Sequence, residues 1–309
     1  MFVPPLFYFK ILYSSEMQTI VTHSGSFDPD DVLAAATVSL YLGEGNYEIV
    51  RSRDDSVIEK ADWVLDVGGK YDPDTKRFDH HQNGVPKRES GVPYSAFGLV
   101  WLEIGEAVCG SASVAEKIER KFVQPIDAAD NQIPVCVPNS AGVESFEFFD
   151  VIEAFKPIWG SDEDFDVGFC RAVSFTRKLL KRIIARNLGD EEMSNYVKSV
   201  YDTSDNKNIL ILDKSIDKRI VSQFEEVKVF VSPSFATEFN NWMAVVVPNL
   251  DGSFINKAGF PKNWGGLIDG ELEEVSGIDG AVFCHKENYI FVAKTKEAAV
   301  QAATKVITG

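Results

Sequence analysis

The sequence predicts an α/β protein whose main domain holds a largely parallel sheet flanked by helices. Apolar, strand-like segments at 17–23, 47–51 and 61–68 alternate with helical patterns at 29–42 and 54–60. This alternation is typical of parallel strands that are connected by helices packed on the sheet. Polar side chains follow the first and third segments, and in open α/β sheets ligands bind beyond the carboxyl ends of the strands. The pattern therefore predicts both a fold class and the edge of the sheet that binds a ligand.

The middle of the chain is predicted to be helical. Helical patterns occur at 95–104 and 114–124, between which small and polar residues form a break. Apolar spacing then predicts a long helix over 164–185, and a further helix that ends at Tyr201. These helices are long enough to cover the faces of the predicted sheet.

A polar break at 203–207 separates two domains. We expect a metal-binding catalytic domain over 17–204 and a smaller α/β substrate-binding domain over 205–309. Residues 1–16 are expected to be an N-terminal extension without stable structure, because Met17 stands directly before the first strand. The second domain has strand-like segments at 208–212, 227–231, 242–247 and 280–285, and a terminal helical pattern at 296–307.

Composition and charge restrict the class of protein and its partners. The chain has 309 residues, of which 45% are hydrophobic and 25% are charged, as in ordinary globular proteins. Its formal net charge is −16. Non-specific affinity for nucleic acids comes mainly from Lys and Arg, so we expect no stable non-specific binding to DNA. A phosphate ligand would need cations to approach the acidic first domain.

The cysteines and the apolar segments predict a cytoplasmic protein without a membrane anchor. The four cysteines are far apart and form no C-x-x-C pair, which argues against a zinc ribbon, a thioredoxin-like site and a disulfide scaffold. The apolar start of the chain is interrupted by Pro4, Pro5 and Lys10 and is too short to span a bilayer. We therefore expect a reducing compartment and no association with membranes.

Imidazole and carboxylate groups gather where the predicted strands end. Side chains of these two kinds, without thiolates, suit Mn²⁺ or Mg²⁺ better than a structural zinc ion. Three of the four histidines of the chain belong to this set. The residues are His23, Asp28, Asp30, Asp66, Asp79, His80 and His81, and the segment 126–131 adds Asp127 and Asp130.

Each part of this set also has an ordinary structural explanation. Asp28, Pro29 and Asp30 are typical of a helix N-terminus, where an N-cap and acidic residues are favoured. Asp66 can end a strand in a polar turn, the histidine pair can belong to a solvated loop, and 126–131 can be a helix end. The four parts occur together and have compatible chemistry, and this combination favours a metal site.

The order of these motifs resembles the DHH phosphoesterase superfamily and, within it, the melanocyte proliferating gene family. The resemblance covers residues 18–307 and extends into the second domain. It implies a metal-dependent hydrolase with exonuclease activity on RNA. The motifs are 23–31 (HSGSFDPDD), 66–73 (DVGGKYDP), 77–82 (RFDHHQ) and 127–131 (DAADN), followed by 261–267 (PKNWGGL) and 276–280 (SGIDG).

The resemblance implies two Mn²⁺ or Mg²⁺ ions and a role for each site residue. His23, Asp28 and Asp66 would hold one ion, while Asp30, Asp66, His80 and one aspartate of 126–131 would hold the second, so that Asp66 bridges both. We favour Asp127 over Asp130 as the last of these ligands. His81 would contact the phosphate or act as general acid, and Asp79 would orient the imidazoles.

In the second domain, Lys257, Lys262 and His285 are expected to face the phosphate. Trp264 or Phe254 is expected to face a base or another apolar group, although core packing is the commoner role for a residue such as Trp264. His285 can equally be a structural histidine. The chain departs from the family pattern at several positions. Asp28 stands where the family has histidine, Gly265 and Lys257 stand where it has arginines, and Phe291 and Val292 replace a glycine pair.

The predicted function is a divalent-metal-dependent phosphodiesterase or exonuclease that acts on RNA or short oligonucleotides by two-metal hydrolysis. A pyrophosphatase or small-phosphomonoester hydrolase on the same centre is one alternative. A non-catalytic protein with a degenerate metal site is another, because the lost arginine and glycine pair would weaken phosphate binding. The natural substrate, the polarity of cleavage and the oligomeric state stay open.

Overall fold

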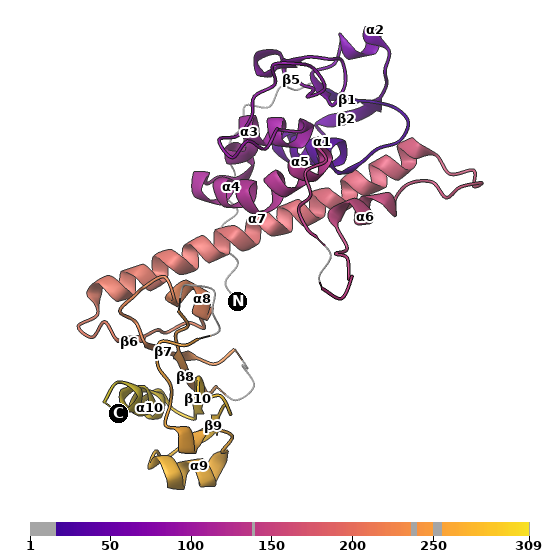
Figure 1. Ribbon diagram of the computed structural model, residues 1–309. Coiled ribbons are helices and arrows are strands. Elements are labelled where there is room, and N and C mark those ends of the chain that lie inside the picture. Colours follow the sequence, from indigo (N-terminus) through magenta and orange to yellow (C-terminus); the bar gives the residue numbers. More distant parts are fainter. Residues whose placement is uncertain (1–16, 138–139, 236–239, 250–254, 309) are drawn as a thin grey trace. The chain divides into compact units, whose positions relative to one another are not determined.

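The computed structural model describes residues 17–137, 140–235, 240–249 and 255–308 (Figure 1). Contacts divide the chain into two compact units, Met1–Leu188 and Gly189–Gly309. The predicted extension 1–16 lies outside the described residues. Helix α7 (Phe165–Thr203) is one continuous element of 39 residues where the sequence suggests two helices, and the division by contacts falls within it.

The first unit contains a five-stranded, mainly parallel sheet, which confirms the predicted fold class. The strands have the order β2-β1-β3-β5-β4. β1 pairs in parallel with β2 and β3, β3 pairs in parallel with β5, and only β4 is antiparallel to its neighbour. The parallel strands therefore present their carboxyl ends at one edge. The strands are β1 (Gln18–Thr22), β2 (Tyr47–Arg51), β3 (Trp63–Leu65), β4 (Tyr71–Asp72) and β5 (Arg77–Phe78).

Helix α1 (Pro29–Leu42) is the central helix of this unit. Ala34, Ala35 and Ala36 are fully buried, and α1 packs closely on α3 (Ala96–Cys109). A helix that is apolar on all sides is typical of a protein interior. The acidic first turn of α1 is therefore also buried. The remaining helices are α2 (Asp55–Ile58), α4 (Ala112–Ile118), α5 (Gln124–Asp130) and α6 (Phe148–Glu153), with a 3-10 turn at Pro73–Thr75 and a π-helical turn at Glu119–Val123.

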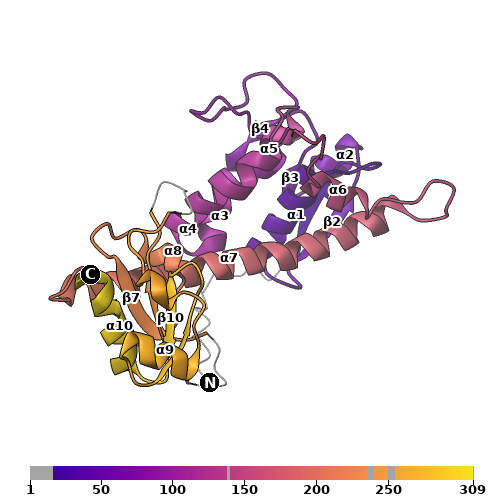
Figure 2. The ribbon, with the colours of Figure 1, turned by 60° about the horizontal axis from the view of Figure 1, so that its bottom comes forward.

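The second unit has a mixed sheet of five strands with the order β6-β7-β8-β10-β9. β6 and β7 are parallel, and the other pairs are antiparallel. Apolar clusters cover both faces of the sheet, and one of them includes the alanines of α10. Figure 2 shows α9 and α10 beside these strands. The elements are β6 (Ile209–Ile211), α8 (Lys218–Val221), β7 (Val229–Pro233), β8 (Trp242–Val246), a 3-10 turn (Lys262–Trp264), α9 (Asp269–Ser276), β9 (Ala281–Cys284), β10 (Ile290–Ala293) and α10 (Lys296–Thr308).

Strand β10 is one of the elements that the sequence analysis does not predict, together with β4, β5, α6, α8 and α9. Phe291 and Val292 belong to β10, which lies between β8 and β9, and Phe291 is fully buried in the apolar core. These residues therefore support the sheet where the family pattern has a glycine pair. No helix of the described residues is both long enough and apolar enough to cross a membrane.

Candidate metal centre

The candidate metal centre lies at the carboxyl ends of the parallel strands of the first unit. His23 follows β1, Asp66 follows β3, and His80 comes two residues after β5. The side chains of His23, Asp66 and His80 are at most 11% exposed. These groups meet because parallel strands end at one edge of the sheet, where α/β proteins bind ligands.

Asp66 is the central residue of the site. Its Oδ2 lies 3.2 Å from His23 Nε2, and its Oδ1 lies 3.3 Å from His80 Nε2 and 3.5 Å from His81 Nδ1. The backbone of Asp66 has a φ of 55°, and its N–H donates a hydrogen bond to the carbonyl of Phe78 on β5. This left-handed conformation is uncommon outside glycine and is tolerated best by Asn and Asp. The two carboxylate oxygens are thus turned toward two different imidazoles.

A second group of ligand atoms comes from Asp30, His80 and Asp130. His80 Nε2 lies 3.6 Å from Asp30 Oδ2 and 3.6 Å from Asp130 Oδ2. Asp30 is fixed by α3, because the Ala96 N–H donates a hydrogen bond to Asp30 Oδ2. The structure therefore brings residues from a strand end, α1 and α5 to one imidazole.

Asp31 is a member of the site that the sequence analysis did not assign. It is fully buried, and its Oδ2 lies 3.3 Å from His23 Nε2. Its Oδ1 accepts a hydrogen bond from the Asp28 N–H. Ligand atoms of Asp28, Asp30 and Asp31 all lie within 4.8 Å of one another. The sequence does not mark Asp31 as a ligand, because acidic residues are common in the first turn of any helix, where they interact favourably with the helix dipole.

Asp79 orients His81, as the sequence analysis expects. Its Oδ1 lies 2.8 Å from His81 Nδ1 and accepts a hydrogen bond from the His81 N–H, while its Oδ2 accepts one from the Gly69 N–H. The His81 side chain is 65% exposed. Among the described residues, Nε2 of His81 forms no hydrogen bond or ion pair, so this nitrogen is available to a substrate.

The structure places Asp130, and not Asp127, beside His80, which corrects the preference for Asp127. Asp127 is fully buried and accepts hydrogen bonds from Ser95 Oγ at 2.6 Å and from the Gly98 N–H. Its Oδ2 lies 2.6 Å from Nη2 of Arg88. A Cβ atom at Gly98 would lie only 1.8 Å from this oxygen, so the glycine makes room for the carboxylate. Asp127 therefore has a structural partner, whereas Asp130 reaches the centre.

Burial and mutual repulsion shift the pKa values of the acidic residues. Burial and the charge of Asp66 raise the pKa of Asp30 well above its usual value. Burial raises the pKa of Asp130 to about 7, although the nearby His80 opposes this shift. Burial would also raise the pKa of Asp66, but hydrogen bonds with His23 and His80 lower it to about 2. Asp66 is therefore the carboxylate that stays ionised most readily.

For the imidazoles, burial lowers the pKa and the neighbouring carboxylates raise it. Burial would lower the pKa of His23, but the hydrogen bond with Asp66 and the charge of Asp31 raise it. Burial would likewise lower the pKa of His80, whereas Asp66 and Asp130 raise it. The site without cations therefore favours protonated imidazoles as local counter-charges.

The donor set fits a hard divalent cation. In the described part of the chain, one buried oxygen of Asp28 accepts no hydrogen bond, and the buried oxygens of Asp31 and Asp66 face only imidazoles. Buried carboxylates with so little compensation are costly. Within the described ranges, no Lys or Arg forms an ion pair with Asp30, Asp31, Asp66 or Asp130. Carboxylate and imidazole ligands without thiolate are the set that Mn²⁺ accepts, and carboxylates are also the ligands of Mg²⁺.

The predicted substrate residues of the second unit have different surroundings. Trp264 is 3% exposed and its ring lies 6.1 Å from Phe260 and 5.4 Å from Phe291, so it is a core residue and not a stacking surface. Lys257 Nζ donates hydrogen bonds to the carbonyls of Phe224 and Glu225. These contacts correct the expectation that Trp264 and Lys257 are free to meet a substrate.

Lys262 and His285 complete the predicted set. Lys262 is exposed, and among the described residues its amino group has no ion pair. His285 is half-buried; its Nδ1 accepts a hydrogen bond from the Glu287 N–H, and its Nε2 lies 3.4 Å from the hydroxyl of Tyr289. These contacts are those of a structural histidine. Phe254 lies outside the described residues.

Gly265 has a steric reason to lack a side chain. A Cβ atom at this position would lie 2.8 Å from the Lys286 carbonyl oxygen and 2.8 Å from Asn288 Oδ1. Real Cβ atoms do not approach backbone so closely. The turn at 286–288 therefore occupies the space into which an arginine would extend.

Comparisons with known proteins assign the family. The sequence model of the MYG1 exonucleases, described as "Uncharacterised protein family (UPF0160)", matches residues 19–307. The chain belongs to this family. This membership confirms the resemblance to the melanocyte proliferating gene family that the motifs predict. Among its relatives, the MYG1 protein of Chlamydia pneumoniae is 30% identical over 294 residues, which cover 92% of this chain and 95% of the relative. The MYG1 exonuclease of Mus musculus is 29% identical over 324 residues, with coverage of 92% and 83%.

One solved structure shows a remote similarity to this family member. It is a pGpG-specific phosphodiesterase from Vibrio cholerae, with a TM-score of 0.31 and 13% identity, and the match covers 89% of this chain and 92% of that chain. A similarity at this level carries no argument about fold or substrate.

The metal-free protein is expected to lose stability as the pH rises from about 5 to about 8. Asp130 has a raised pKa of about 7, so its contribution to stability is present below pH 3.8 and is lost as the pH rises through about 7. His23 and His80 act in the same direction, because their pKa values are raised above 6.5. The lowered pKa of Asp66 matters only at more acidic pH. Melting temperatures measured in EDTA check this sign.

Added Mn²⁺ should raise the melting temperature more at the upper end of this range, because ligands must be deprotonated to bind a metal. A melting temperature that rises with pH in EDTA, or a Mn²⁺ effect independent of pH, would contradict the assignment of these groups to one acidic site.

Asp130→Asn and Asp127→Asn should have different effects. Asp130→Asn is expected to weaken Mn²⁺ binding by at least about tenfold, since even groups that only support metal ligands have effects of this size. Asp127→Asn removes the charge of one of the two carboxylates paired with Arg88, the other being Glu119, and should lower the free energy of unfolding by about 1–3 kcal/mol. Calorimetric titration with Mn²⁺ and urea unfolding measure the two quantities. Equal losses of Mn²⁺ affinity in both variants would contradict the assignment of metal binding to Asp130 alone and of a structural role to Asp127.

Proposed function

We propose that this protein is a divalent-metal-dependent phosphodiesterase that removes nucleotides from RNA or short oligonucleotides. The observation that carries the proposal is the central position of Asp66, whose two oxygens face two separate groups of ligands. Membership in the family supports it, because relatives from several mammals bear the name MYG1 exonuclease. The four unpaired cysteines are consistent with a reducing, cytoplasmic location.

The contacts support the following division of ligands between two Mn²⁺ or Mg²⁺ ions. His23 and Asp66 would hold one ion together with the carboxylates of Asp28 and Asp31. Asp30, His80 and Asp130 would hold the second, and Asp66 would bridge the two. When bound, such a pair supplies charge that stabilises the attacking and leaving oxygens and lowers the pKa of water.

The residues of the chain then have distinct tasks. Asp66 stays ionised at neutral pH, since its pKa is lowered to about 2, and it keeps His23 and His80 facing the site. Asp79 accepts a hydrogen bond from Nδ1–H of His81. In the protonated ring, the outward-facing Nε2–H can therefore donate a hydrogen bond to a phosphate oxygen or a proton to the leaving oxygen. Among the predicted residues of the second unit, exposed Lys262 is the one that remains available for phosphate.

Hydrolysis of bis(4-nitrophenyl) phosphate and of a short single-stranded RNA tests this proposal. Both activities should require Mn²⁺ or Mg²⁺ and disappear in excess EDTA. Asp66→Asn, which keeps the shape of the side chain but removes its charge, should abolish both. Full activity in EDTA would contradict the proposal. Turnover of pyrophosphate or phosphomonoesters alone would favour the small-substrate hydrolase, and metal binding without any turnover would favour a non-catalytic protein.

His81→Ala should lower kcat by about 10²- to 10⁴-fold, the usual size of general acid–base assistance, while Mn²⁺ affinity stays near that of the parent protein. His80→Ala is the matched control and should weaken Mn²⁺ binding. The reason is that His80 Nε2 lies among the carboxylates, whereas His81 is held by Asp79 and is largely exposed. Calorimetry beside steady-state kinetics measures both effects. Equal losses of metal affinity would make His81 a ligand.

A further inference from the structure

A basic surface on α7 stands out in this acidic protein. The stretch 165–188 holds six Lys and Arg residues and one Asp, whereas the whole chain has a net charge of −16. We define the basic face of α7 as Arg171, Lys178, Lys181, Arg182 and Arg186, all of which are exposed. Within the described part of the chain, none of these five side chains forms an ion pair.

Helical spacing places these residues on one side of α7. At 100° per residue, the basic face spans about 140° of the helix circumference and about 22 Å of its length. The opposite side packs into the apolar core through Phe169, Ala172, Val173 and Leu180. Lys178 with Arg182, and Arg182 with Arg186, are like-charged pairs at i and i+4, which destabilise a helix. An anionic partner would remove this repulsion.

The start of α7 is tied to the loop that enters the metal centre. Phe27, in the loop between His23 and Asp28, packs its ring against Phe165 and Phe169 of α7 at 6.4 and 5.6 Å. Arg51 reinforces this link: its guanidinium is ion-paired with Asp166 and donates a hydrogen bond to the Gly25 carbonyl. The loop that carries a ligand of the centre therefore packs on the buried side of α7, at the end of the helix from which the basic face starts.

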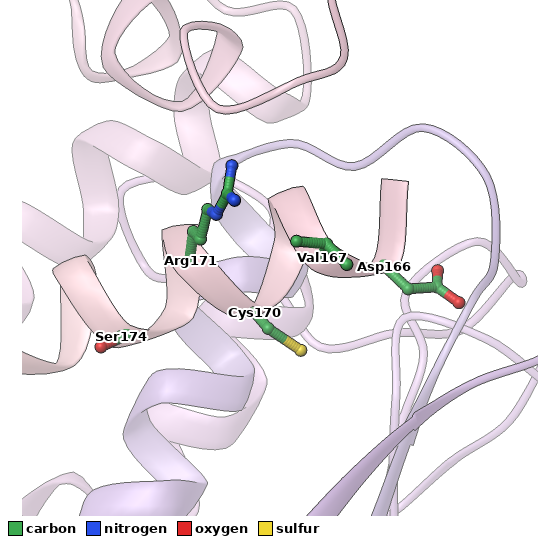
Figure 3. A pocket seen from close by; sticks show the side chains of 5 residues that line it. All are labelled: Asp166, Val167, Cys170, Arg171 and Ser174. Atoms are coloured by element: carbon green, nitrogen blue, oxygen red, sulfur yellow. The ribbon is translucent and has the colours of Figure 1, made fainter. Parts of the chain in front are cut away.

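The surface at this end of α7 is hollowed and partly aromatic. Arg171 lines two hollows of 440 and 530 Å³, whose walls also include acidic residues of 162–166. Figure 3 shows the Arg171 side chain leaving α7 on a different side from that of Cys170. Phe175 is 41% exposed between Arg171 and Lys178. Basic side chains interleaved with an exposed aromatic ring are the combination that binds single-stranded nucleic acids.

We propose that the basic face of α7 binds the phosphate backbone of the single-stranded RNA whose end reaches the metal centre. This inference rests on the proposed function and adds the surface that holds the rest of the strand. An anionic membrane is a poorer fit, because a helix that inserts at a membrane surface needs a free apolar face. The apolar face of α7 is buried in the core of its own unit.

The test compares two triple variants that change the net charge equally. The face variant carries Lys178→Gln, Arg182→Gln and Arg186→Gln. The control carries Lys60→Gln, Lys121→Gln and Lys305→Gln, three exposed lysines on other elements. Fluorescence anisotropy with a labelled single-stranded RNA in EDTA measures affinity without cleavage, and circular dichroism checks the helix content of both. The single variant Arg182→Glu provides an independent measurement.

The face variant should bind RNA at least about tenfold more weakly at 100 mM salt, and its log–log salt slope should be shallower by about 2, since each phosphate contact in a single strand contributes about 0.7. The control variant should bind like the parent protein. Arg182→Glu should weaken binding in the same direction as the face variant.

Equal RNA affinity of the face and control variants would overturn the inference. The inference would also be overturned if the parent protein did not bind RNA. It would likewise be overturned if the face variant lost binding to phosphatidylserine vesicles but bound RNA like the parent protein. Failure of the proposed function is recognised separately, as absent turnover of bis(4-nitrophenyl) phosphate by the parent protein with Mn²⁺.

Discussion

Negative charge held inside the protein is the constraint on which the rest of the structure depends. Asp30, Asp31, Asp66 and Asp130 lie within a few side-chain lengths of one another, and among the described residues their charged neighbours of opposite sign are only histidines. Such a cluster does not assemble by itself, because its members repel one another and lose solvation. The sheet, the buried first turns of helix α1 and the hydrogen bond from α3 to Asp30 hold it in place.

Helix α5 shows two ways in which the protein handles a buried acid. Asp127 is neutralised by Arg88, accepts a hydrogen bond from Ser95, and lies directly against Gly98. Asp130, one turn later, faces His80 without a permanent cation. The first residue therefore anchors the helix, and the second leaves charge available to a ligand. Both have raised pKa values, of about 6 for Asp127 and about 7 for Asp130, with burial as the main cause.

The sequence was most informative where function depends on local order along the chain. Strands β1 and β3 could be predicted from the apolar pattern of the sequence. The meeting of the polar residues that follow them could be predicted because parallel strands end at the same edge of a sheet. The partnership of Arg88 with Asp127 could not be predicted, because the residues are far apart in the sequence and their contact depends on how the loop before α3 packs. Asp31 was hidden by a plausible alternative explanation. For Trp264 the sequence left both core packing and a substrate contact open, because sequence alone does not distinguish a buried ring from an exposed one.

The turn at 286–288 limits the changes that remain open to this lineage. Because its backbone and Asn288 occupy the space beside Gly265, an arginine could not be introduced at that position by a single substitution without displacing the turn. A compensating change in the turn would have to accompany it. A neighbouring loop therefore opposes any side chain at this position, whereas exposed positions elsewhere can accept a basic residue without such a clash.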